Sequence, residues 1–234
     1  MQKITFLRNK NNINFNYNIL RENLPNHSSI NDLGINFQSN LLFNTHIENI
    51  CSKALKTLGF LIRSSKEFSN ESCLKILYCA LVRSILEYCS VIWNPSQIGL
   101  INMLERVQKR FLRYISFKRL HFNTNTTNIS IESIQSNLSL SSLLSCRKLN
   151  DATFVYKLIN GHISCPSLLE LIPFHIPRFN SRLCPTFHEK THRTNYGYNN
   201  PLDRMFRECN KIDSFDFFIP NSLPALRRIF LNIS

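Results

Sequence analysis

The chain contains 234 residues, 43% of them hydrophobic, and this is enough to bury a core in one large domain or two small ones. Its 28 Lys and Arg outnumber its 15 Asp and Glu, which gives a formal net charge of +13 at pH 7. Such a charge disfavours a cationic partner and favours a polyanion, either nucleic acid or an anionic membrane surface.

Residues 1–28 are rich in Asn and show neither a helical nor an alternating period, so we expect a poorly ordered lead-in there. No stretch of the chain approaches the roughly 18 apolar residues of a membrane span, and the N-terminus lacks the apolar segment of a secretory signal peptide. We therefore expect an intracellular protein, nuclear or cytoplasmic, that makes no membrane contact. Residues 30–37 alternate between apolar and polar side chains and predict a short strand.

A first helix is predicted from Thr45, because Thr45 and Glu48 have the spacing of a capping box. We expect Gly59 to end this helix early. Its apolar face recurs at three- and four-residue steps and comprises Ile47, Ile50, Cys51, Ala54, Leu58, Leu61 and Ile62.

A second helix is predicted to begin at a cap formed by Ser69 or Asn70 and to stop at the Trp93-Asn94-Pro95 sequence. Arg83 and Glu87 lie four residues apart on it and predict a structural ion pair. Its apolar stripe is Leu74, Leu77, Tyr78, Leu81, Val82, Ile85, Cys89 and Ile92.

A third helix follows from Ile98 to about Ile115, and its polar face is strongly basic. Only Glu105 lies within this face to offset the cations. The face could bind the phosphates of a nucleic acid, or it could be the solvated side of an amphipathic helix. The candidate nucleic-acid-binding residues are Arg106, Lys109, Arg110, Arg113, Lys118 and Arg119.

The second half of the chain is less regular. Residues 121–133 are polar and predict a linker between a helical domain at 29–120 and a helical and irregular region at 134–234. In that region we expect one helix closed by Asn160-Gly161 and a brief helix from Pro201 to Asn210. The fold class is therefore mostly α, a helical bundle with a short N-terminal strand and a Pro-rich, irregular C-terminal part.

The eight cysteines show no pair with the two-residue spacing of a zinc knuckle. The nearest approach to a metal-ligand cluster is Cys184, His188 and His192, where Pro185 argues against one helix that presents all three. We expect reduced cysteines that pack as small hydrophobes, with no metal and no cofactor, while a structural metal at these three residues remains the alternative.

No catalytic constellation is evident. The five aspartates include no adjacent pair to hold two divalent cations, and no Gly-rich phosphate loop or nucleophile elbow occurs. A Cys–His nucleophile pair is the remaining enzymatic alternative, although no particular residues are singled out for it.

Several segments, in order, resemble the region beyond the palm in the reverse transcriptases of non-LTR (LINE-type, jockey-like) retrotransposons. The resemblance covers about residue 30 to the end. It lies in DLGINFQSNLLFNTHIENICSKALKTLGFLIR, LYCALVRSILEYCSVIWNP, INMLERVQKRFLRYI, SLLSCRKLNDATFVYKLINGHI, NPLDRMFRECN and NSLPALRR.

This resemblance implies that residues 44–119 form a helical thumb that grips a primer–template duplex. The fingers, the palm and the family's Tyr-x-Asp-Asp motif have no counterpart in the sequence. We therefore expect a truncated, catalytically silent member of this RNA-directed DNA polymerase family, which at most binds RNA–DNA or DNA duplexes non-specifically. The alternative is a protein–protein interaction module that docks or self-associates through the Leu74–Ile92 stripe.

Overall fold

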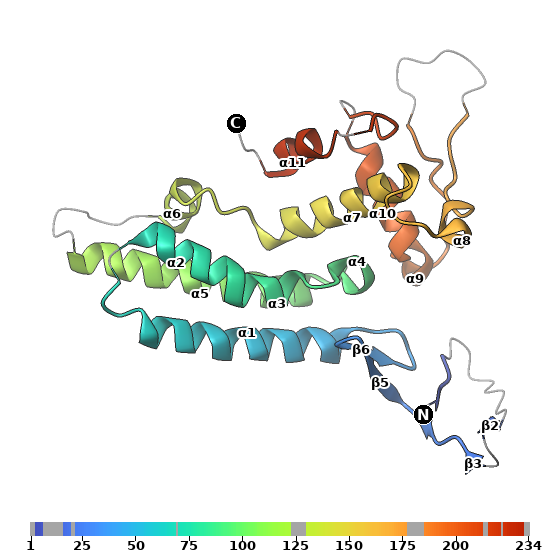
Figure 1. Cartoon of the computed structure of the whole chain (residues 1–234), viewed down its shortest axis with the longest axis horizontal. Helices are drawn as coiled ribbons and strands as arrows, with labels where there is room; N and C mark the ends of the chain where they lie inside the picture. The colour runs from blue at the N-terminus through green and yellow to red at the C-terminus, as the bar shows by residue number, and fades with distance from the viewer. Residues whose placement is uncertain are drawn as a thin grey trace.

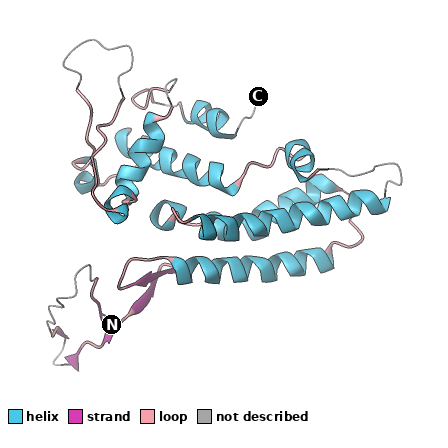
Figure 2. Cartoon of the chain, turned by 180° about the vertical axis from the view of Figure 1, so that it is seen from behind, coloured by secondary structure: helices cyan, strands magenta, loops and turns pink. Residues whose placement is uncertain are grey.

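The computed structural model describes residues 3–6, 16–19, 22–68, 70–122, 130–176, 185–212, 215–220 and 222–231. The fold is mostly helical, with short strands gathered at the N-terminal end, so the predicted fold class is confirmed (Figures 1 and 2). The strands are β1 (Lys3–Ile4), β2 (Asn18–Ile19), β3 (Glu22–Asn23), β4 (Asn26–His27), β5 (Ser29–Asp32) and β6 (Ile35–Gln38). The helices are α1 (Asn44–Ser64), α2 (Glu71–Tyr78), the π-helix η1 (Cys79–Arg83), α3 (Ser84–Glu87), α4 (Ser90–Trp93), α5 (Ile98–Phe122), α6 (Ile131–Asn137), α7 (Leu143–Ile159), α8 (Pro166–Leu169), α9 (Asn195–Tyr198), α10 (Pro201–Asn210) and α11 (Leu223–Leu231).

The strand predicted at residues 30–37 is a hairpin. β5 and β6 pair antiparallel, and the turn between them places Leu33 and Gly34 at φ values of 46° and 83°. Two successive left-handed residues give the turn that matches the twist of a two-stranded ribbon. The predicted lead-in, 1–28, is described only in part, and its described pieces form two-residue strands, with β1 paired to β4 and β2 to β3.

The start of α1 differs from the predicted capping box. The helix begins at Asn44 without a side-chain cap, because the residue before it is Phe43, whose side chain has no acceptor. Thr45 lies inside the helix, and its hydroxyl accepts a hydrogen bond from Gln38 Nε2 at 3.1 Å. This bond joins the hairpin to α1. Gly59 does not end the helix, which continues to Ser64 because Leu58 and Leu61, on either side of the glycine, are buried in the core.

The second predicted helix is capped as expected, since the Asn70 side chain accepts hydrogen bonds from the backbone of α2. It is not continuous, however. A turn of π-helix replaces the middle, and the chain breaks at Cys89, which has a φ of 51°. One further turn, α4, then ends at Trp93, two residues before Pro95.

The π-helix decides which side chains of this segment face inward. The residues fully buried in the core follow each other at four-residue steps, and they are Leu74, Tyr78, Val82 and Leu86. In an α-helix of 3.6 residues per turn this series would drift around the axis, whereas the wider turn of η1 keeps it in line. Leu81 of the predicted stripe is consequently 43% exposed, and Ile92, which lies beyond the break at Cys89, is 40% exposed.

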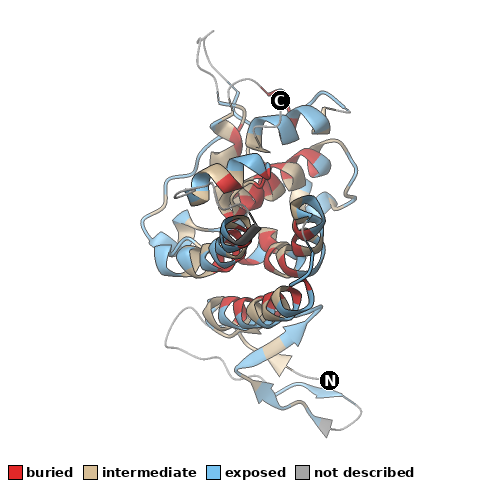
Figure 3. Cartoon of the chain, turned by 90° about the vertical axis from the view of Figure 1, so that its left-hand side faces the viewer, coloured by how far each residue is buried: buried red, intermediate tan, exposed pale blue. Residues whose placement is uncertain are grey.

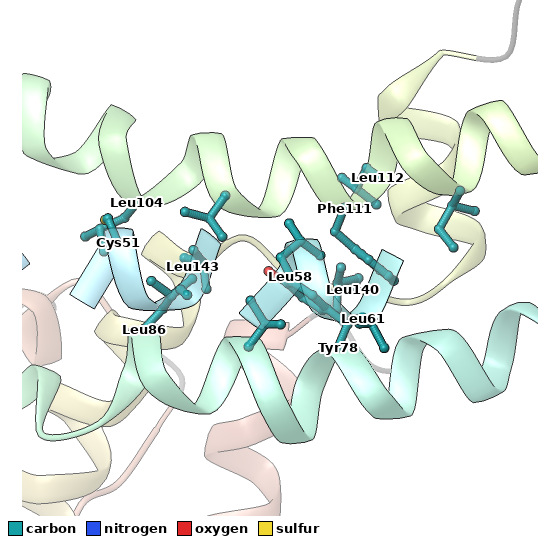
Figure 4. Packing of buried hydrophobic residues seen from close by; sticks show 14 of the residues in the cluster. Cys51, Leu58, Leu61, Tyr78, Leu86, Leu104, Phe111, Leu112, Leu140 and Leu143 are labelled. Carbon is teal, nitrogen blue, oxygen red and sulfur yellow. The ribbon is translucent and has the colours of Figure 1, made fainter. Parts of the chain in front are cut away.

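The first hydrophobic core lies between α1, the α2–η1–α3 segment, α5 and the α6–α7 connection (Figures 3 and 4). Tyr78 stacks on Phe111 within it, with ring centroids 4.1 Å apart. The core extends past the predicted domain boundary at 121–133, because it also contains Ile134, Leu138, Leu140 and Leu143. Residues 123–129 of the predicted linker lie outside the described residues.

A second core begins at Leu149 in the same helix, α7, and joins it to α8, α10 and α11. Aromatic rings dominate it, with Phe187 stacked on Phe206 at 5.1 Å. The predicted closure of α7 before Gly161 and the predicted helix from Pro201 are both confirmed. Since α7 belongs to both cores, the division between them falls within this helix, after the predicted boundary.

A buried polar cluster fixes the junction between the two cores. The carboxylate of Asp151, on α7, accepts hydrogen bonds from Arg204 Nε and Asn94 Nδ2, each at 3.1 Å. Arg204 also donates to the backbone carbonyls of Val91 and Asn94, and Arg147 Nε donates to the Asn94 side chain. Burial raises the pKa of Asp151, and Arg204 opposes this by stabilising the carboxylate.

We predict that Asp151→Asn lowers the free energy of unfolding by about 3 kcal/mol, because it leaves the mostly buried Arg204 guanidinium without its counter-ion. Urea denaturation followed by circular dichroism measures this change. Asp32→Asn, an exposed aspartate in β5, removes the same charge and is the control. Equal stability of the two variants would show that the buried cluster does not hold the halves together.

Candidate nucleic-acid interface

Four of the six predicted binding residues form a continuous basic surface on α5. We call this surface the α5 ridge, and it consists of Arg106, Lys109, Arg110 and Arg113. All four are exposed, on the side of the helix opposite the buried Leu104 and Phe111. Within the described part of the chain, none of the four charged groups has an ion-pair or hydrogen-bond partner. The ridge is therefore available to an external anion.

Lys118 does not belong to the ridge, contrary to the sequence prediction. Its side chain is buried, and Nζ donates to the carbonyl of Ser65 at 2.6 Å and to those of Lys66 and Phe68. These carbonyls lie in the turn that follows the C-terminus of α1, where the helix dipole favours a cation. Lys118 thus stabilises the end of α1.

Arg119 also has a structural partner. Its Nε and Nη2 atoms donate to the two carboxylate oxygens of Glu71, at 2.6 and 2.5 Å. This hydrogen bonding raises the pKa of Arg119. Because Glu71 is the first residue of α2, the pair ties the C-terminal part of α5 to the start of α2 and neutralises the charge that we predicted for phosphate binding.

Glu105 is the only acidic residue of α5, and its carboxylate does not face the ridge. Its Oε1 accepts a hydrogen bond from the backbone N–H of Leu144 at 2.9 Å. Leu144 lies in the first turn of α7, where unpaired backbone amides and the helix dipole favour an anion. The one negative charge of α5 is therefore used inside the fold and leaves the outer face cationic.

Sequence analysis missed three exposed cations on the neighbouring helix, namely Lys53, Lys56 and Arg63 of α1. One feature of the sequence could have revealed them: no Asp or Glu occurs from Ile50 to Lys66, so the cations there have no acidic neighbour along the helix. The sequence does not reveal that this helix packs against α5. α1 and α5 pack along their length in the same direction (Figure 1). The hydroxyls of Ser65 and Tyr114 lie 3.1 Å apart, which sets the two helices in register.

The alternative metal site is only partly described. Cys184 lies outside the described residues, and His192 Nε2 lies 2.9 Å from the Asp203 carboxylate. Across the described ranges, no three His, Cys, Asp or Glu side chains are grouped as metal ligands.

The five aspartates are also separate from one another where described, with Asp151 bound to Arg204 and Asp216 accepting the backbone N–H of Phe218.

Comparison with known proteins gives one relative of undetermined function. An uncharacterized protein of Caenorhabditis elegans is 26% identical over 144 residues, which cover 62% of this chain and 70% of that protein. No protein-family model and no solved structure matches the sequence. Among the described helices, none is both long enough and apolar enough to cross a membrane.

We predict that Lys118→Met lowers the free energy of unfolding by about 1–3 kcal/mol, because the carbonyls of Lys66 and Phe68 lose their donor and that of Ser65 loses one of its donors. Lys109→Met, on the exposed ridge, is the matched control and should change stability by no more than about 0.5 kcal/mol. Thermal or urea denaturation measures both. A neutral effect of Lys118→Met would mean that its ammonium is not the cap of α1.

Proposed function

We propose that this chain binds nucleic-acid duplexes non-specifically through the α5 ridge, as a catalytically silent, thumb-like helical module of the kind found in non-LTR retrotransposon reverse transcriptases. The proposal rests on one observation: the four ridge cations are exposed, and none of them has a partner within the described residues. Its link to that polymerase family rests on the sequence resemblance alone.

The geometry of α5 suits the phosphate backbone. From Arg106 to Arg113 the helix rises about 10 Å, so the ridge can meet several phosphates of one strand, which carries a charge every 3.4 Å or so along the duplex axis. Three of the four residues are arginines, whose guanidinium groups can bind phosphate oxygens in pairs. Phosphate contacts position a duplex without reading its bases, and this is why the proposed binding is non-specific.

The inner face of α5 makes the ridge rigid. Leu104, Val107 and Phe111 are fully buried in the first core, and Gln108 donates a hydrogen bond to the carbonyl of Ser141 at 3.0 Å. A helix held along its whole inner side keeps its outer charges at fixed spacing. The cations therefore meet a duplex without a cost for ordering the backbone.

We expect that replacing the four ridge residues by Gln weakens duplex binding and lowers the slope of log affinity against log salt concentration by about 3.6, since each phosphate contact contributes about 0.9. Fluorescence anisotropy with a labelled blunt RNA–DNA duplex, at about 50 and 200 mM salt, measures both quantities. The ridge variant carries Gln at Arg106, Lys109, Arg110 and Arg113.

The matched control loses the same charge from exposed positions in the second half of the chain, and carries Gln at Lys190, Arg193, Arg227 and Arg228. It should keep most of the wild-type affinity and slope. If both variants lose affinity equally, binding depends on net charge and not on the α5 ridge, and the proposed site is wrong.

The proposal includes the absence of polymerase activity. Nucleotidyl transfer needs carboxylates gathered around two divalent cations, whereas Asp151 and Asp203 are each engaged by a basic side chain. The purified chain should extend no primer on an RNA or DNA template with Mg²⁺ or Mn²⁺, in a gel assay that follows a labelled primer. Extension that survives repurification of the chain would contradict this part of the proposal.

The second candidate function, protein–protein docking, cannot use the whole Leu74–Ile92 stripe, because Leu74, Tyr78 and Val82 are buried in the first core. Two exposed apolar residues favour it: Leu81 of the stripe is 43% exposed on η1, and Ile76 is 66% exposed on α2. Sedimentation equilibrium tests self-association through these residues, with a double variant that carries Glu at both positions. Concentration-dependent dimers that this variant abolishes would favour docking.

A further inference from the structure

The outer face of α1 combines three cations with one aromatic ring. We call this set the α1 strip, and it consists of Lys53, Lys56, Phe60 and Arg63. The spacing of three and four residues places all four on the side of α1 opposite the buried Leu58. Phe60 is 59% exposed and is the only large hydrophobic side chain of α1 that is exposed, in a helix whose residues are all described.

The helix that carries the α1 strip packs against the helix that carries the α5 ridge. Figure 4 shows the parallel order of the two helices, with Cys51 and Leu104 toward one end of the cluster and Leu61 and Leu112 toward the other. The contact between Ser65 and Tyr114 places Arg63 and Arg113 at the same height along the bundle. Both surfaces therefore present cations at corresponding levels of neighbouring helices.

The strip contains an aromatic ring, Phe60, whereas the ridge consists of cations alone, and this difference indicates a different ligand. A duplex offers phosphates but keeps its bases stacked inside, so an exposed phenyl ring gains little from a duplex backbone. An unpaired base offers a flat face, and stacking of a base on an aromatic ring, flanked by cations that contact the phosphates, is how proteins hold single strands. Lys56 and Arg63 lie on either side of Phe60, about 10 Å apart along the helix.

We infer that the α1 strip binds single-stranded nucleic acid, as the unpaired extension of a duplex held on the α5 ridge. One base stacks on Phe60, and the phosphates beside it contact Lys56 and Arg63. The placement of the strand next to a duplex rests on the proposed function, whereas the stacking itself depends only on the α1 strip.

A membrane is the other polyanion that a basic helix face could meet. Helices that lie in a membrane surface bury a wide apolar face among the lipids, beneath a basic polar face. The apolar face of α1 is instead inside the first core, since Ile47, Ala54 and Leu58 are fully buried there. A single phenyl ring among cations fits a base better than it fits a bilayer.

The test compares a labelled blunt duplex with the same duplex carrying a single-stranded tail of about six nucleotides. By anisotropy, the wild-type chain should bind the tailed duplex more tightly, and Phe60→Leu should lower that affinity by about 5- to 150-fold, in line with the measured range for stacking of one base. Phe60→Trp, which keeps an aromatic face, should retain the advantage of the tail. Neither variant should change binding of the blunt duplex.

Charge and stacking can be separated with a second variant. Lys56→Gln combined with Arg63→Gln should lower the salt slope for the tailed duplex by about 1.4, at about 0.7 for each single-strand phosphate, and should leave the slope for the blunt duplex unchanged. Because both residues are exposed, circular dichroism should show an unaltered helix content.

The outcomes distinguish this inference from the proposed function. If the tail adds no affinity, or if Phe60→Leu and Phe60→Trp behave alike, the inference is wrong even when the α5 ridge binds the blunt duplex. If the ridge variant binds the blunt duplex as the wild type does, the proposed function fails instead. Binding to vesicles of anionic lipid that requires Phe60, with no effect of the tail, would also overturn the inference.

Discussion

The carboxylate of Asp151 joins parts of the chain that lie far apart in the sequence. It sits fully buried on α7, receives Arg204 from α10 and Asn94 from the segment between α4 and α5, and so links the two hydrophobic cores at one point. A buried charge is costly unless its partners satisfy it, and the two partners here come from two separate elements outside α7. These hydrogen bonds therefore fix the position of one half relative to the other, because a hydrogen bond depends more strongly on distance and angle than an apolar contact does.

The shared helix α7 explains why the basic surface can be rigid. Its N-terminal turn packs in the first core and donates a backbone N–H to the carboxylate of Glu105, while residues from Leu149 onward pack in the second core. α5 is thus held from the inside by apolar side chains and from the side by this hydrogen bond. The same contact removes the one acidic group that could have neutralised the α5 ridge, so a stabilising interaction also shapes the electrostatic surface.

The cations near the end of α5 show how similar residues acquire different roles. Lys118 and Arg119 are the next cations after the ridge in the sequence, yet Lys118 donates to the carbonyls that follow α1 and Arg119 pairs with Glu71. The helical rotation of 100° per residue turns both away from the face that carries Arg113, toward neighbours contributed by other helices. Structural and exposed basic groups are therefore separated by their position around the helix and not by residue type.

The sequence by itself determined the helical class, the strong basic charge, the cap at Asn70, the end of α7 and the short helix from Pro201, because each depends on residues close together along the chain. Four residues of the α5 ridge were also found from helical spacing alone. Tertiary structure decided which cations remained exposed, because the partners of Lys118 and Arg119 lie about fifty residues away. It also decided the π-helix at η1, the loss of the capping box at Thr45 and the neighbouring strip on α1. These depend on the packing of one element against another, which periodicity within a single segment does not reveal.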